Sequence, residues 1–184
     1  MSNITPQEFT PSEIQLMLDN LDHYTLEEQE ELDKLLEELD KKQRAEACYN
    51  DLIEFCCLMQ PDYKVGSHHR ILADLLMEIE SGKEAEKGKD RICVNIPPRH
   101  GKSQLVSIYF PAWFLGRNPT KKVMMVSHTT DLAVDFGRKV RNLIGTEQYQ
   151  AIFPNVQLAS DSKSAGRWNT NVGGEYYACG IGSS

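Results

Sequence analysis

The chain has 184 residues, of which 40% are hydrophobic and 26% charged, and its formal net charge is −7. This length suffices for one domain with a hydrophobic core and an appendage, and the composition is ordinary for a globular protein. No apolar run approaches the roughly 18 residues that span a bilayer, the N-terminus lacks the features of a signal peptide, and the five cysteines indicate neither a zinc site nor a disulfide framework.

The N-terminal quarter is strongly acidic. Residues 1–46 contain 13 Asp and Glu against 4 Lys and Arg, a net of −9, whereas the remainder carries +2. The segments 10–13 and 25–28 each fit a helix capping box, and leucines recur on one helical face after each. We therefore expect residues 1–45 to form an acidic helical arm, a hairpin that packs on other structure or serves as a partner-binding arm. Residues 46–184 would form the body.

The first part of the body is predicted to be helical. A helix is expected from about Ala45 to Leu58. Ser67 is expected to cap the next helix, with Gly82 at its C-terminal end. The predicted apolar face of that helix consists of Ile71, Leu72, Leu75, Leu76 and Ile79.

From residue 92 onward, predicted strands alternate with predicted helices. Residues 92–96 and 122–127 are predicted to be buried strands. A helix follows each strand: one runs from about Lys102 to Leu115 with a kink at Pro111, and the other ends at Gly145. The second helix has a predicted apolar face of Leu132, Phe136, Val140 and Leu143. This order predicts a parallel sheet with right-handed crossovers, and the last forty residues predict a hairpin that turns at 171–174.

The stretch between the first strand and its helix carries the candidate chemistry. Gly101, Lys102 and Ser103 form the end of a phosphate-binding loop, in which backbone N–H groups, a lysine and a hydroxyl meet a nucleotide phosphate and Mg²⁺. Ile96 stands where such loops usually have a glycine, and the rigid turn at Pro97 and Pro98 replaces that residue's freedom. The alternative is a surface Gly-Lys-Ser at an ordinary helix start, and the strand–turn–helix context favours the nucleotide site.

Three blocks give the chain a specific resemblance. "NIPPRHGKSQLVS", "VMMVSHTTDLAVDFGRKVRNLIG" and "DSKSAGRWNTNVGGEYYACGIGSS" resemble the large terminase subunit of tailed bacteriophages, as does "DYKVGSHHRILADLL". The resemblance covers roughly residues 50–184. It implies an α/β fold, the additional-strand, RecA-like P-loop NTPase with a three-layer core, here truncated and preceded by the helical arm.

The resemblance also implies site residues and cofactors. Lys102 and Arg99 would supply the catalytic cations, and Ser103 would bind Mg²⁺. ATP would contact Pro98, Arg99, His100, Gly101, Lys102, Ser103 and Gln104. The segment around Tyr63 and His68 corresponds to the region associated with adenine. Arg167 is a candidate trans-acting arginine, with a solvated hairpin arginine as the alternative.

The resemblance implies a DNA-packaging motor in the host cell cytoplasm, driven by ATP hydrolysis. Its partners would be double-stranded viral DNA, the portal protein of the procapsid, the small terminase subunit and further copies in a homo-oligomeric ring, with no membrane. The acidic residues of the Walker B strand and the nuclease domain would follow Ser184, so we expect this chain alone to hydrolyse ATP negligibly. The alternatives are an inactive nucleotide-binding or interaction module and a P-loop kinase. A basic face at Arg138, Lys139 and Arg141 is either solvated or a contact for DNA or a neighbouring subunit.

Overall fold

The computed structural model describes residues 24–82, 91–160 and 164–182. Internal contacts divide the chain into two compact units, Met1–Gln43 and Arg44–Ser184. The predicted capping box at 10–13 and the first helix of the arm lie outside the described residues.

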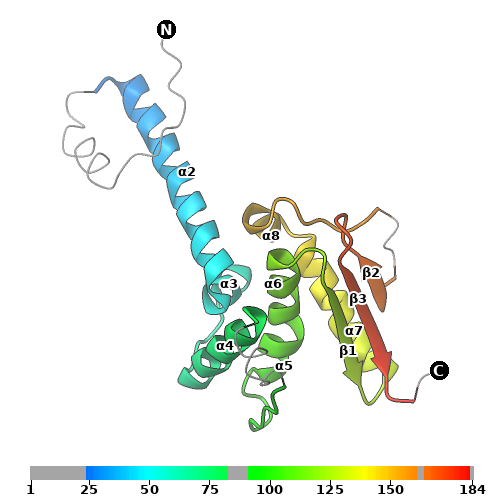
Figure 1. Cartoon of the computed structure of the whole chain (residues 1–184). Helices are drawn as coiled ribbons and strands as arrows, with labels where there is room; N and C mark the ends of the chain where they lie inside the picture. The colour runs from blue at the N-terminus through cyan, green and yellow to red at the C-terminus, as the bar shows by residue number, and fades with distance from the viewer. Residues whose placement is uncertain (1–23, 83–90, 161–163, 183–184) are drawn as a thin grey trace. The chain divides into compact units, whose positions relative to one another are not determined.

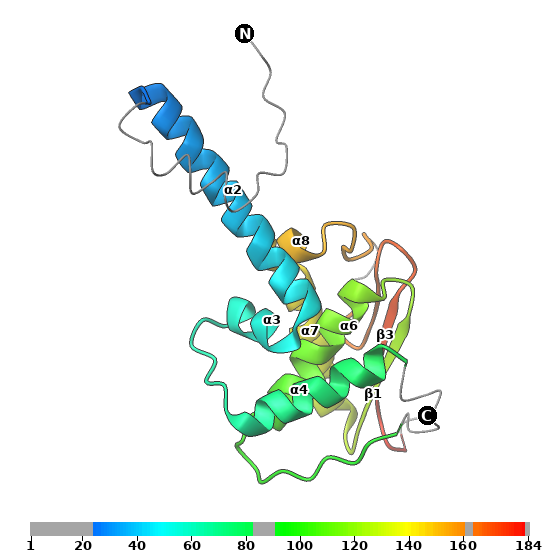
Figure 2. The ribbon, with the colours of Figure 1, turned by 60° about the vertical axis from the view of Figure 1, so that its left-hand side comes forward.

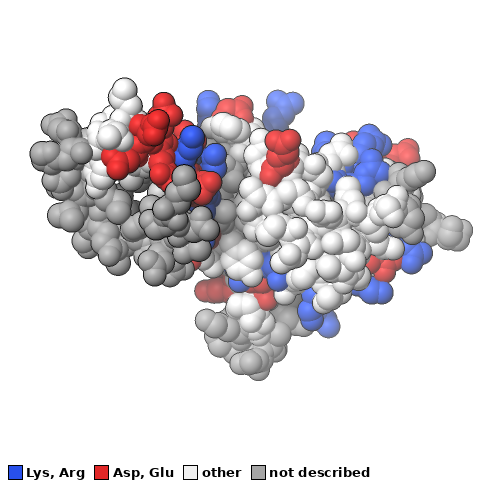
Figure 3. Space-filling model, turned by 90° about the horizontal axis from the view of Figure 1, so that it is seen from above, with Lys and Arg blue, Asp and Glu red and all other residues white. Residues whose placement is uncertain are grey.

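The acidic segment that is described forms a long helix, α2 (Leu26–Asn50). Its start confirms the second capping box, because Thr25 N–H donates to Glu28 Oε2 at 2.8 Å and Glu28 N–H donates to Thr25 Oγ1 at 3.4 Å. Figure 3 shows the acidic side chains of this helix gathered in red. The prediction of a new helix at Ala45 was wrong, because residues 40–50 contain no glycine or proline and α2 continues through them.

The break comes at Asp51, which caps α3 (Leu52–Met59). The Asp51 carboxylate accepts from the N–H groups of Ile53 at 2.7 Å and Glu54 at 3.0 Å. A carboxylate in this position satisfies two of the N–H groups that a helix start leaves without partners. The same carboxylate forms an ion pair with Arg70 of the following helix at 2.5 Å.

That following helix is α4 (Ser67–Glu80), and its N-cap is Gly66 and not the predicted Ser67. Its buried residues are His69, Leu72, Ala73 and Leu76. The predicted face was therefore correct at Leu72 and Leu76 but rotated as a whole, since Ile71 is 70% exposed. The polar His69 occupies a place in the buried face that apolar periodicity does not reveal.

The helical run after the candidate loop is continuous but irregular. It consists of α5 (Lys102–Gln104), a π-helical segment η2 (Leu105–Tyr109) and α6 (Phe110–Arg117). Phe110 N–H donates to the carbonyl of Leu105, five residues back. Pro111 has no N–H, and its ring would press on the carbonyl one turn earlier, so a wider turn precedes it. The predicted helix is thus confirmed, and the disturbance expected at Pro111 takes the form of a π-bulge.

Within the described residues, the sheet has three strands in the order β1-β3-β2, namely β1 (Lys122–Ser127), β2 (Arg167–Asn169) and β3 (Glu175–Gly180). β1 runs parallel to β3, and β2 pairs antiparallel with β3, which confirms the predicted hairpin. Between β1 and β2 the chain forms α7 (Thr130–Ile144) and α8 (Glu147–Ile152). Figures 1 and 2 show α7 lying along the sheet.

Two strand predictions were wrong. Residues 92–96 form no strand, because no described strand pairs with their backbone. β1 is a strand but not a buried one: Met124 and Val126 are 67% and 49% exposed on the sheet face that α7 does not cover. Within the described residues, helices cover one face of the sheet, so the structure has two layers where the resemblance implies three. The predicted parallel pairing exists, but it joins β1 to β3.

The buried face of α7 also differs from the predicted one. Ala133, Gly137, Val140 and Ile144 are buried, whereas Leu132 is 39% exposed. The close packing at Gly137 explains why a small residue lies in this face, because a Cβ there would be 2.7 Å from the carbonyl oxygen of Ala165 and 3.0 Å from the ring of Tyr176. Small residues let α7 approach β3 closely. The prediction looked for large apolar residues, so it was correct at Val140 but placed the rest of the buried face one position away.

Both tryptophans serve packing. Trp113 and Trp168 are each 1% exposed. Their indole N–H groups donate to the carbonyls of Cys48 at 2.9 Å and Gly137 at 3.2 Å. These bonds join α6 to α2 and β2 to α7. Among the described residues, no helix combines the length and apolar character required to span a membrane.

Candidate functional site

The candidate loop enters the helical run through two left-handed residues. Arg99 has φ 66° and Gly101 has φ 73°, and Gly101 is the N-cap of α5. Left-handed backbone is unfavourable for any residue with a Cβ, so its occurrence at Arg99 requires support from the surroundings. Lys102 is the first helical residue, where backbone N–H groups lack partners within the helix and favour an anion.

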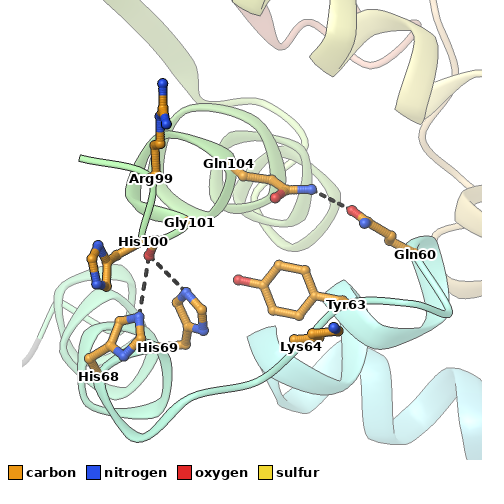
Figure 4. Close-up of a pocket in the computed structure, with 9 residues that line it drawn as sticks. All are labelled: Gln60, Tyr63, Lys64, His68, His69, Arg99, His100, Gly101 and Gln104. Atoms are coloured by element: carbon orange, nitrogen blue, oxygen red, sulfur yellow. Dashed lines mark hydrogen bonds between the residues drawn. The ribbon is translucent and has the colours of Figure 1, made fainter. Parts of the chain in front are cut away.

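The support for this turn comes from α4. The carbonyl oxygen of His100 lies 3.0 Å from Nε2 of His69 and 3.3 Å from Nε2 of His68. Figure 4 shows both rings directed at this oxygen, while the side chain of Arg99 points away from them. The peptide between the two left-handed residues is therefore held by two side chains from a helix about thirty residues earlier in the sequence.

Among the described residues, two hollows adjoin the loop. The smaller, of about 200 Å³, is lined by the loop alone, namely Pro97, Pro98, Arg99, His100, Gly101, Lys102, Ser103 and Gln104. The larger, of about 320 Å³, is lined by Gln60, Tyr63, Lys64, His68, His69, Arg99, His100, Gly101 and Gln104. Because the two share four residues of the loop, one ligand could extend from one hollow into the other.

A hydrogen-bonded group forms one wall of the larger hollow. Gln60 Oε1 accepts from the Tyr109 hydroxyl at 2.7 Å and from the side-chain amide of Gln104. Figure 4 shows the dashed bond from Gln104 to Gln60 beside the ring of Tyr63. Burial raises the pKa of Tyr63 and of Tyr109, so both phenols remain protonated at neutral pH. The buried Tyr63 hydroxyl has no hydrogen-bond partner within the described structure.

All seven predicted nucleotide-contacting residues line the smaller hollow. Tyr63 and His68 line the larger one. Arg167 lies in β2, where its guanidinium pairs with Glu175 at 2.7 Å and its side chain is 68% exposed. The predicted basic face is partly neutralised, since Arg138 and Lys139 both pair with Asp135 and Arg141 donates to the carbonyl of Ser164.

Sequence reasoning missed Gln60 and the structural part played by His69. Gln60 is the C-cap of α3 and has no sequence signal of its own. His69 does have one, because it shares the buried face of α4 with Leu72 and Leu76, and a histidine inside an apolar stripe indicates a buried polar contact.

Fold and loop together define a mixed α/β protein in which a Gly-Lys-Ser sequence opens a helix beside two hollows that share residues of the loop. Residues 93–169 match the family model described as terminase large subunit, T4likevirus-type, N-terminal. This match confirms the resemblance to large terminase subunits over these residues. No curated protein and no solved structure gives a significant match to the chain.

Proposed function

We propose that this chain binds ATP and Mg²⁺ at the loop 97–104 and contributes the nucleotide-binding part of a phage DNA-packaging motor. The observation that carries the proposal is the left-handed Gly101 followed by Lys102 and Ser103 at a helix start, inside a hollow that the loop itself lines. Large terminase subunits are in general ATPases, which agrees with a phosphate site here.

The nucleotide would be divided between the two hollows. The triphosphate would occupy the smaller one, where Lys102 and Arg99 supply positive charge and the backbone supplies N–H donors. Ser103 is exposed at the rim, so its hydroxyl is free to take a place in the coordination of Mg²⁺. Gln104 would lie under the junction of the two hollows, since it lines both.

The base would occupy the larger hollow. Tyr63 and His68 offer ring faces, and Gln60 offers an amide whose oxygen is already engaged and whose N–H groups would donate to a base acceptor.

We extend the proposal to the partners that a packaging motor would need. The ATPase would act in the host cytoplasm on double-stranded viral DNA, as a homo-oligomeric ring docked on the portal protein and supplied by the small terminase subunit. Hydrolysis would be coupled to DNA translocation, with Lys102 and Arg99 neutralising charge on the transferred phosphoryl group. Stimulation of ATP hydrolysis by procapsids is the observation that separates this motor from a kinase.

Calorimetry with ATP and Mg²⁺ tests the binding site. Lys102→Ala removes the cation at the phosphate end and should weaken ATP binding at least tenfold, or about 1.4 kcal/mol. Lys121→Ala is the matched control, because it removes an equal charge from an exposed lysine just before β1. Equal ATP affinity of Lys102→Ala and the parent chain would refute the site.

A further inference from the structure

We propose that His69 is a positioning residue that sets the shape of the loop 97–104 from the opposite side of the larger hollow. The inference rests on the proposed nucleotide site and assigns to α4 the task of keeping its phosphate-binding turn ready. His69 is 7% exposed, and its ring connects the start of α4 to the carbonyl of His100.

The hydrogen bonds of His69 fix which ring nitrogen carries the proton. The N–H of Gly66 donates to Nδ1 of His69 at 3.0 Å, so Nδ1 must be an acceptor without a proton. Nε2 then carries the hydrogen and donates it to the carbonyl of His100 at 3.0 Å. The ring is therefore neutral, and both of its nitrogens are engaged in a defined direction.

The bond to His100 orients the peptide that begins the phosphate-binding turn. In a trans peptide the C=O of one residue and the N–H of the next point in opposite directions. With the carbonyl of His100 held toward α4, the N–H of Gly101 is directed away from His69, to the other side of the loop. Free rotation of this peptide would exchange a donor for an acceptor at the place where a phosphate would bind.

The ring also determines which residue can stand at 101. A Cβ built on Gly101 overlaps Nε2 of His69, so this close approach and the φ of 73° both require glycine. Arg99 adopts φ 66° without the freedom of a glycine, and the bond to His100 compensates for this strain from one residue away. His69 thus explains how the loop keeps left-handed residues on both sides of His100.

His68 shares the carbonyl but is not equivalent to His69. Its Nε2 lies farther from the oxygen, at 3.3 Å, and the bond is exposed to solvent. Its ring lies 4.0 Å from that of His69 and 5.9 Å from that of His100, centroid to centroid. Water can replace an exposed donor but not a buried one, so the buried His69 carries the positioning.

Two conservative substitutions separate the two bonds of His69. In His69→Asn the amide oxygen reaches as far as Nδ1 and keeps the bond from Gly66, but nothing reaches His100. In His69→Gln the amide nitrogen reaches as far as Nε2 and keeps the bond to His100. Leu76→Ala, two turns along the same buried face, is the control for lost stability without lost positioning.

The full chain, labelled with ¹⁵N, provides a readout that needs no nucleotide. We expect the ring of His69 to be the neutral Nε2–H tautomer, and we expect His69→Asn to shift the amide resonances of Gly101 and Lys102. His69→Gln and Leu76→Ala should leave these resonances near their original positions. A charged or Nδ1–H ring, or equal shifts in the Asn and Gln variants, would overturn the positioning role.

Calorimetry with ATP and Mg²⁺ then connects the loop to its ligand. His69→Asn should weaken ATP binding about fivefold, equivalent to one neutral hydrogen bond of about 1 kcal/mol, while His69→Gln stays within about twofold of the parent. Equal affinity of the Asn variant and the parent would overturn the inference while leaving the nucleotide site intact. An absence of ATP binding by the parent would instead overturn the proposed function, and the amide resonances would still decide whether His69 shapes the loop.

Discussion

Gly101→Ala should damage the candidate site by two separable effects. Residue 101 has φ 73°, a conformation that costs an alanine about 1–2 kcal/mol. The new methyl group also overlaps Nε2 of His69 and displaces the ring from the carbonyl of His100, which removes a hydrogen bond of about 1 kcal/mol. The two effects together amount to about 2–3 kcal/mol.

This cost can lower either the free energy of unfolding or the affinity for ATP, depending on whether the loop of the variant changes shape when no ATP is bound. If the variant loop keeps its shape, the free energy of unfolding falls by the full amount; if it relaxes, ATP must restore the shape and the affinity falls by up to about 30- to 150-fold. Urea denaturation and calorimetry measure the two parts, and their sum should be about 2–3 kcal/mol.

Gly82→Ala is the matched control for this prediction. Gly82 has nearly the same φ, 75°, but a Cβ there meets nothing within 4 Å. Its variant should therefore show the cost of the left-handed backbone alone, and the effect of replacing glycine in the unfolded chain cancels between the two. If Gly101→Ala costs no more than Gly82→Ala and leaves ATP affinity unchanged, the contact between the loop and His69 has no energetic weight.

Three further predictions concern the rest of the chain. Hydrogen bonds from Lys122 and Arg167 lower the pKa of the Glu175 carboxyl group in the folded chain. The ionised Glu175 therefore stabilises the fold above its usual pKa of 4.5, and this stabilisation is lost as the pH falls through the lowered pKa. In melting curves recorded across acid pH, Glu175→Gln should lack this part of the pH dependence. Deletion of residues 1–43 should leave a cooperatively melting body, because every residue of the described core lies beyond the deletion, and a broad, non-cooperative melt would contradict this. Native alkylation at pH 8 should modify Cys93 first, because it is exposed, whereas Cys179 is half-buried and burial raises the pKa of Cys48, Cys56 and Cys57. Mass spectrometry of timed samples would show the order.

Two local features of the fold were predicted correctly, because short-range chemistry fixes them. The capping box at Thr25 and Glu28 and the disturbance at Pro111 depend on neighbouring residues alone, and both are present. The failure at residues 92–96 has the opposite cause. A strand needs a second strand to pair with, and that strand lies elsewhere in the sequence. The apolar character of residues 92–96 is therefore not enough to predict that their backbone pairs in a sheet.

The candidate site likewise combines residues that the local sequence predicts with residues that it does not. Gly101, Lys102 and Ser103 were identified from spacing, and the structure brings them together at one helix start. Gln60 and His69 reach this loop from α3 and α4, about forty and thirty residues earlier, through tertiary packing. Contacts of that range are set by how helices pack, so local patterns predicted the loop but not its supports.

The residue at 96 illustrates why a loop of this kind can dispense with its usual first glycine. The side chain of Ile96 is partly buried against the core, a packing role that glycine cannot fill. The left-handed backbone that a tight turn requires occurs instead at Arg99 and Gly101, after the two prolines. Because the histidines of α4 hold the peptide between these residues, the freedom of a glycine at 96 is replaced by hydrogen bonds from another helix. The departure from the common loop pattern and the histidine contacts of α4 are thus two parts of one arrangement, and a glycine at 96 would remove core packing without relieving any backbone strain.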